Sequence, residues 1–182
     1  MMNRQKMMQF LRAIASITEE KNYVLIGSAT VLLSAKNIPS QMLNTNEIDV
    51  YSPDSKDEEE FSFMVESIGK GSHFDNTFGY FGDGVSSKTA IMPADWQTRS
   101  RKIEEASLPG ITITVPDIND IALAKMCAWR DKDQEWLMAG VRALILKPKS
   151  MQARLPQMPE SSTPRSELQH RMQVVFSYGG PA

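Results

Sequence analysis

The chain has 182 residues, of which 41% are hydrophobic and 23% are charged, a balance typical of a single soluble globular domain. The formal net charge of −2 gives no global basic field that would attract nucleic acid, although it leaves room for a local basic patch. A single cysteine, Cys127, excludes an internal disulfide, and no apolar run reaches the roughly 20 residues that span a bilayer.

The N-terminal part of the chain alternates between helical and extended patterns. Residues 3–20 carry apolar side chains at helical spacing, which predicts an amphipathic helix without the long apolar stretch of a signal peptide. We therefore expect a cytoplasmic protein with no membrane partner. Residues 23–26 are apolar and favour a buried strand, and residues 29–35 favour a short helix with Ser28 as its N-cap. Residues 47–51 predict a second strand.

The middle of the chain predicts one further helix and a set of strands. Residues 52–69 begin with Ser-Pro-Asp and an acidic run, as the first turn of a helix often does, and end at a glycine. Residues 71–92 alternate glycine, aromatic and polar side chains, which favours strands around a turn at Asp83 and Gly84. Residues 111–115 predict another strand, and residues 118–146 read as helix.

The C-terminal part differs in composition from the rest of the chain. It is polar and contains several prolines, so we predict one or two helices over residues 149–175 and a frayed tail from residue 177 onward. We therefore divide the chain into a main domain, residues 1–147, and a peripheral C-terminal helical segment with a tail, residues 148–182.

The main candidate site combines a Gly-Ser step with two nearby carboxylates. Because successive strand side chains point to opposite faces, Glu47 and Asp49 share one face while Ile48 and Val50 take the other. Two carboxylates on one rigid edge can hold Mg²⁺. A Gly-Ser turn that opens a helix, here Gly27 and Ser28, can cradle phosphate. The alternative without a functional site is that Glu47 and Asp49 lie on a solvent-facing sheet edge and that Ser28 is an ordinary helix cap.

Three segments in order give the chain a family resemblance. Residues 26–28 (Ile-Gly-Ser) followed by residues 47–49 (Glu-Ile-Asp) resemble the signature of the nucleotidyltransferase superfamily of the DNA polymerase β type. Residues 123–133 (LAKMCAWRDKD) resemble the "sKLaAxRxKD" helix of a bacterial subgroup of uncharacterised nucleotidyltransferase-like proteins related to AbiEii-type toxins. Residues 92–99 (MPADWQTR) are similar to the "LPxGWxxR" segment of that subgroup.

The resemblance implies an α+β fold, with a small mixed sheet flanked by helices and further helices at the C-terminus. It implies an enzyme that transfers a nucleotidyl group from a Mg²⁺-bound nucleoside triphosphate to a hydroxyl of an acceptor. By the same resemblance the acceptor is an RNA, for instance a tRNA end, or a protein. The likeness to AbiEii-type toxins adds an antitoxin protein as a partner in a toxin–antitoxin system.

The resemblance also assigns roles to individual residues. Glu47 and Asp49 would be metal ligands, and Gly27 and Ser28 would bind phosphate. Lys125 would bind the nucleotide and neutralise phosphate charge during catalysis. Asp133 would be a further catalytic acid that orients Lys125 or activates the acceptor. A spacing of eight residues would place Lys125 and Asp133 on similar sides of a continuous helix.

Three departures from the family signature favour an alternative. Glu47 stands where the family more often has Asp, and Leu43 stands where related sequences often have Arg. Active members supply a third metal-binding carboxylate from a later strand. Asp83 is the candidate here, but its two glycine neighbours also suit a simple turn. The alternative is a non-catalytic nucleotide-binding or protein-interaction module of the same fold.

Overall fold

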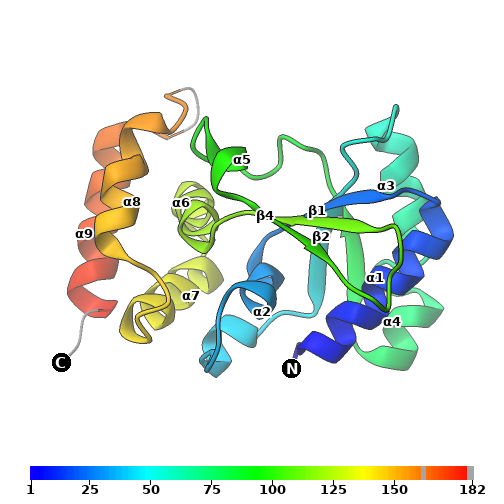
Figure 1. Ribbon diagram of the computed structural model, residues 1–182. Helices are drawn as coiled ribbons and strands as arrows, with labels where there is room; N and C mark the ends of the chain where they lie inside the picture. Colours follow the sequence, from blue (N-terminus) through cyan, green and yellow to red (C-terminus); the bar gives the residue numbers. More distant parts are fainter. Residues whose placement is uncertain (161–162, 180–182) are drawn as a thin grey trace.

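A five-stranded mixed sheet runs through the centre of the computed structural model, which describes residues 1–160 and 163–179 (Figure 1). The strand order is β3-β2-β1-β5-β4. Strand β1 pairs antiparallel with β2 and parallel with β5, while β2 pairs parallel with β3 and β4 pairs antiparallel with β5. The strands are β1 (Asn22–Ile26), β2 (Glu47–Tyr51), β3 (Phe81–Gly84), β4 (Arg101–Glu104) and β5 (Thr112–Val115).

The longer helices form two groups at opposite ends of the view in Figure 1. The first group contains α1 (Arg4–Thr18), α3 (Glu58–Glu66) and α4 (His73–Phe78). The second contains α6 (Ile118–Ala128), α7 (Asp131–Arg142), α8 (Pro148–Arg154) and α9 (Arg165–Gly179). Short helical segments complete the connections: η1 (Ser28–Thr30), α2 (Val31–Ser34), η2 (Ser40–Leu43), α5 (Trp96–Arg99) and η3 (Leu155–Gln157). No helix in the described part of the chain could cross a membrane.

Apolar positions at the expected spacing build the core. Helix α1 begins at the Asn3 cap, whose side chain accepts the backbone N–H of Lys6, and buries Phe10 and Ile14 completely. Strand β2 alternates as predicted, because Ile48 and Val50 are fully buried on one face. Burying side chains of this size contributes roughly 1.5–3 kcal/mol each. The opposite face of β2 is thereby left to its two carboxylates.

The prediction of a turn at Asp83 is wrong. Residues 73–78 form helix α4, which begins at a Ser72 cap, and residues 81–84 form strand β3. This strand runs parallel to β2, so its residues extend the sheet instead of reversing the chain. Gly82 is required for packing, because a Cβ there would lie 2.5 Å from a ring carbon of Phe10. Asp83 is therefore held on a sheet strand.

Three expectations about helices are also wrong. The helix expected over residues 52–69 begins only at Glu58, because its cap is Asp57 and the Ser-Pro-Asp segment lies before it. Helix α6 ends where Trp129 adopts a left-handed backbone with φ of 53°, so residues 118–146 are two helices instead of one. Ser28 does not cap a helix with its side chain, since it is the first residue of η1 and that segment has no side-chain cap.

At the edges of the molecule, residues 101–104 form the edge strand β4, which their polar composition did not reveal. In the C-terminal segment, α9 packs against α7 and α6, and α8 packs against α6. Residues 177–179 of the expected tail belong to α9, while residues 180–182 lie outside the described residues.

Candidate nucleotide site

The sequence-predicted residues converge on one pocket of about 200 Å³. It lies where strand β1 passes into η1, beside strands β2 and β3 and under helix α6. The predicted residues that line it are Gly27, Ser28, Glu47, Asp49, Asp83 and Lys125. Asp133 does not line the pocket but contacts Lys125 from the adjacent helix α7. Segments far apart in the sequence thus supply one polar cavity.

Asp49 is the central carboxylate of this pocket. In the sheet register it lies opposite Ile26 of β1 on one side and opposite Asp83 of β3 on the other. Burial raises the pKa of Asp49 to about 7, and the negative charges of Glu47 and Asp83 add to this effect. Burial, with a contribution from Glu47, also raises the pKa of Asp83. Three carboxylates, those of Glu47, Asp49 and Asp83, therefore lie in one cavity, where their negative charges repel one another.

Gly27 makes room for the carboxylate of Asp49. Its backbone has φ of 71° and ψ of −164°, a conformation that is essentially restricted to glycine. A Cβ at this position would lie 1.8 Å from the Asp49 Oδ2 atom. The close approach of this carboxylate to the Gly27 backbone explains why the strand-to-η1 turn needs glycine.

Lys125 brings a positive charge to the same pocket. It is only 5% exposed, and its Nζ donates to Ser28 Oγ at 2.8 Å and to Asp133 Oδ1 at 2.7 Å. Burial lowers the pKa of Lys125, with Asp133 opposing the shift. Burial alone would raise the pKa of Asp133, but hydrogen bonds from Arg130 and Lys125 hold it below its usual range. Asp133 thus orients Lys125 toward Ser28.

Two basic residues near the pocket are not among the catalytic, nucleotide-binding or metal-binding residues that the sequence predicted. Arg130 lines the pocket and donates its Nε to Asp133 Oδ2 at 2.7 Å. Lys132 donates its Nζ to Glu47 Oε1, also at 2.7 Å. Both belong to the segment 123–133 that carries the resemblance. In the sequence these two basic residues flank Asp131, the first residue of α7. That pattern is the signal that could have revealed them.

The donor set of the pocket suits a hard divalent cation. In residues 1–160 and 163–179 no group of three or more Asp, Glu, His or Cys side chains is placed to hold a metal ion. Carboxylate oxygens are nevertheless the preferred protein ligands of Mg²⁺, which keeps several positions for water and substrate. A cation would also relieve the repulsion from Glu47 and Asp83 that raises the pKa of Asp49. Glu47 and Asp49 therefore fit a partial ligand set.

Comparison with known proteins places the chain in a family. Residues 5–177 match the family model described as "Nucleotidyltransferase of unknown function (DUF6036)". The chain belongs to this family. No curated protein and no solved structure matches the chain. The mixed sheet with flanking helices is consistent with a nucleotidyltransferase-like fold, as the sequence predicted.

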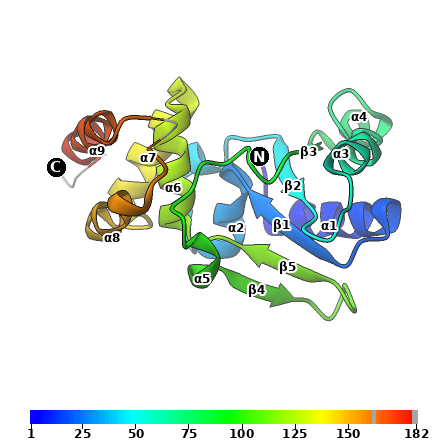
Figure 2. The ribbon, with the colours of Figure 1, turned by 90° about the horizontal axis from the view of Figure 1, so that it is seen from above.

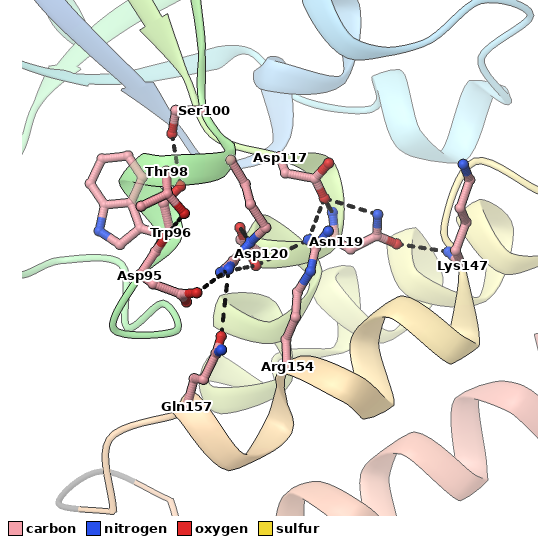
Figure 3. Close-up of polar contacts among 11 residues, drawn as sticks. Asp95, Trp96, Thr98, Ser100, Asp117, Asn119, Asp120, Lys147, Arg154 and Gln157 are labelled. Atoms are coloured by element: carbon pink, nitrogen blue, oxygen red, sulfur yellow. Dashed lines mark hydrogen bonds and ion pairs between the residues drawn. The ribbon is translucent and has the colours of Figure 1, made fainter.

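In this member of the family a second polar cluster supports the helix that carries Lys125. Asp120 of α6 is fully buried and accepts Arg99 Nε at 2.9 Å and Arg99 Nη2 at 3.1 Å. Arg154 of α8 donates to Asp120 at 3.1 Å and also pairs with Asp117. Figure 3 shows these contacts between α6 and the segments on either side of it. The segment 92–99 thus acts through Arg99 as a structural brace.

Proposed function

We propose that the protein transfers a nucleotidyl group from a Mg²⁺-bound nucleoside triphosphate to a hydroxyl of an acceptor. The observation that carries the proposal is the convergence of Asp49, Asp83 and Glu47 with Ser28 and Lys125 on one pocket. A cation site beside a phosphate-binding turn is the combination that phosphoryl transfer requires, because positioning and charge neutralisation provide most of the catalysis. The family match supports the same class of reaction.

The residues of the pocket have distinct roles in this proposal. Glu47 and Asp49 would hold the metal, with Asp83 as the third carboxylate beside them. When bound, Mg²⁺ neutralises phosphate charge and orients the reacting groups. Ser28 and the backbone at Gly27 would bind the phosphates.

Lys125 would neutralise phosphate charge while Asp133 keeps its ammonium group in place. The acceptor oxygen attacks the α-phosphorus, the bond to the β-phosphate oxygen breaks, pyrophosphate leaves, and the hydroxyl proton passes to water.

The proposal identifies the acceptor only by its chemical class. Exposed cations near the pocket, Arg130 and Lys132, favour an acceptor with negative charge, such as an RNA end. A protein hydroxyl is the other acceptor that the resemblance to AbiEii-type proteins suggests. That resemblance also motivates a place in a toxin–antitoxin system, with an antitoxin protein as partner.

Label transfer tests the proposed activity. The wild-type chain would be incubated with α-labelled ATP, GTP, CTP or UTP, Mg²⁺, total RNA and cell extract. We expect label to appear in RNA or in a protein, and to disappear with Asp49→Ala or with chelator. Asp54→Ala is the matched control, because Asp54 is exposed and pairs with Asn22 outside the pocket. No transfer by wild type, or equal transfer by Asp49→Ala, overturns the proposal.

A non-catalytic nucleotide-binding module is the second candidate. The observation that favours it is the Lys132 ammonium group on Glu47, which occupies an oxygen that a catalytic metal would need. Calorimetry with each nucleoside triphosphate, with and without Mg²⁺, separates the two candidates. Binding without label transfer supports this second function, whereas binding with transfer supports the enzyme.

A further inference from the structure

A second cavity of about 160 Å³ adjoins the candidate nucleotide site. It shares Ser28 and Glu47 with the main pocket, so the two cavities meet at these residues. The sequence assigned nothing to it. Its volume, like that of the main pocket, is below the roughly 300–1,000 Å³ of pockets that enclose a whole small molecule. The cavity therefore suits a single chemical group of a larger ligand that also reaches the main pocket.

The lining of this cavity is rich in hydrogen-bond donors. Lys132 contributes an ammonium group, and Asn44 and Asn46 contribute side-chain amides. Trp136 also lines it and is 2% exposed, and its indole N–H has no hydrogen-bond partner among the described residues. Among the residues that the structure describes, Glu47 is the one carboxylate that lines the cavity, and it is already paired with Lys132. Such a lining favours a group with several acceptor oxygens and negative charge.

The positive charge of Lys132 is available to a ligand only when its ion pair with Glu47 is broken. The side chains of Lys132 and Glu47 are 52% and 29% exposed, and ion pairs with this exposure contribute little to stability. A metal ion held by Glu47 would take over the carboxylate and leave Lys132 without its partner. The ammonium group would then face a donor-lined cavity with no counter-charge, which is the arrangement of an anion site.

We propose that this cavity is a phosphate subsite, and that Lys132 exchanges Glu47 for a phosphate group when substrate binds. The proposal rests on the proposed function for the identity of the substrate. The phosphate has two sources with the same chemistry. One is the triphosphate tail of the donor, and the other is the phosphodiester backbone of a ribonucleotide acceptor.

The exchange can be tested without metal and without activity. Glu47→Gln removes the carboxylate charge and so releases Lys132 in a buffer that contains chelator. Calorimetry would measure the binding of inorganic triphosphate and, separately, of a tetraribonucleotide with a 5′-hydroxyl. We expect Glu47→Gln to bind at least one probe more tightly than wild type. Adding Lys132→Gln should then weaken that binding about tenfold, the loss expected for one charged hydrogen bond.

Matched variants separate the subsite from general electrostatics. Lys149→Gln removes the same charge from an exposed position on α8, outside both cavities, and should leave binding unchanged. Asn44→Asp adds a negative charge to the lining with almost no change in size, and should weaken binding as Lys132→Gln does. Melting temperatures of all variants would confirm that each one is folded.

The outcomes assign the source of the phosphate or overturn the subsite. Loss of triphosphate binding alone identifies the donor tail, and loss of tetraribonucleotide binding alone identifies the acceptor. If Lys132→Gln affects neither probe, or if Lys149→Gln weakens binding equally, the subsite is wrong. Because no transfer is measured, this result leaves the proposed enzyme untouched. A protein that binds phosphate through Lys132 but transfers no label keeps the subsite and loses the enzyme.

Discussion

At the residue scale, Asp49 combines burial with two like charges, and this combination makes protein stability depend on pH. In the folded protein, burial raises the pKa of Asp49 from the ordinary value of 3.8 to about 7. Asp49 therefore keeps its proton to a higher pH in the folded state than in the unfolded state. Between these values the folded state binds more protons than the unfolded state, so the free energy of unfolding falls as pH rises. Each unit of pH within this window costs at most about 1.4 kcal/mol.

Asp49→Asn should remove this dependence. We expect the variant to gain stability relative to wild type as pH rises from about 4 to 7, and to keep a constant advantage above that range, in buffer without divalent metal. Urea denaturation at pH 5, 6, 7 and 8 measures the difference, with Asp54→Asn as the reference variant. A difference in stability between Asp49→Asn and wild type that does not change with pH contradicts the raised pKa of Asp49.

Gly27 offers a second prediction at this scale. Gly27→Ala places a Cβ on the Asp49 carboxylate and adds about 1–3 kcal/mol of backbone strain. In a background of Asp49→Ala the carboxylate clash is absent, so Gly27→Ala should cost only the strain. A double-mutant cycle in urea isolates the difference between the two costs. A coupling free energy near zero would show that Asp49 does not lie against Gly27.

At the element scale, the two helices on either side of Trp129 form a single structural unit. Helix α6 carries Lys125 and helix α7 carries Asp133, and the break between the helices lets the two side chains meet. Arg171 of α9 stabilises the end of α6, because its Nη1 donates to the carbonyls of Met126 and Cys127. Its guanidinium group also lies 5.2 Å from the centre of the Trp129 ring.

The ion pair between these helices should respond asymmetrically to mutation. Asp133→Asn removes the ion-pair partner of the buried Lys125, a change that costs about 3–5 kcal/mol. Lys125→Met should cost less than about 1.5 kcal/mol, because Asp133 keeps Arg130 and Met fills a similar volume. Urea denaturation compares the two, and Asp131→Asn on an exposed position of α7 is the control. Equal losses for Asp133→Asn and Lys125→Met would contradict this asymmetry.

Elements with a local signal could be predicted from the sequence, and elements that depend on distant partners could not. The alternation in residues 47–50 is local, and the structure confirms the face on which each side chain lies. Asp83 belongs to a strand only because β2 pairs with it. The helix break at Trp129 comes with hydrogen bonds from Arg171 of α9 to the end of α6, and no local pattern indicates this distant contact. Ion pairs such as Lys132 with Glu47 need the folded arrangement to be seen at all.

At the scale of the whole molecule, the C-terminal segment supports the site, although its described residues do not line the main pocket. Seen from above, α8 and α9 lie beyond α6 and α7, on the side away from α3 and α4 (Figure 2). Helix α8 reaches back to α6 through Arg154, and α9 buries Leu168 and Val175. Because α6 carries Lys125, contacts from α8 and α9 help to fix one wall of the pocket.

Arg154 provides the test of this long-range support. Arg154→Gln removes one of two arginine partners from fully buried Asp120 and should cost about 1.5–3 kcal/mol, the contribution of charged hydrogen bonds. Lys149→Gln on the same helix is exposed and should change stability by less than about 0.5 kcal/mol.

Thermal and urea unfolding compare the stabilities of the two variants. Calorimetry with inorganic triphosphate then measures whether the pocket still binds phosphate. Reduced stability with unchanged binding would limit Arg154 to the fold. Loss of stability and of binding together would show that α8 positions the helix carrying Lys125. Equal stability of the two variants would contradict the support of α6 by Arg154.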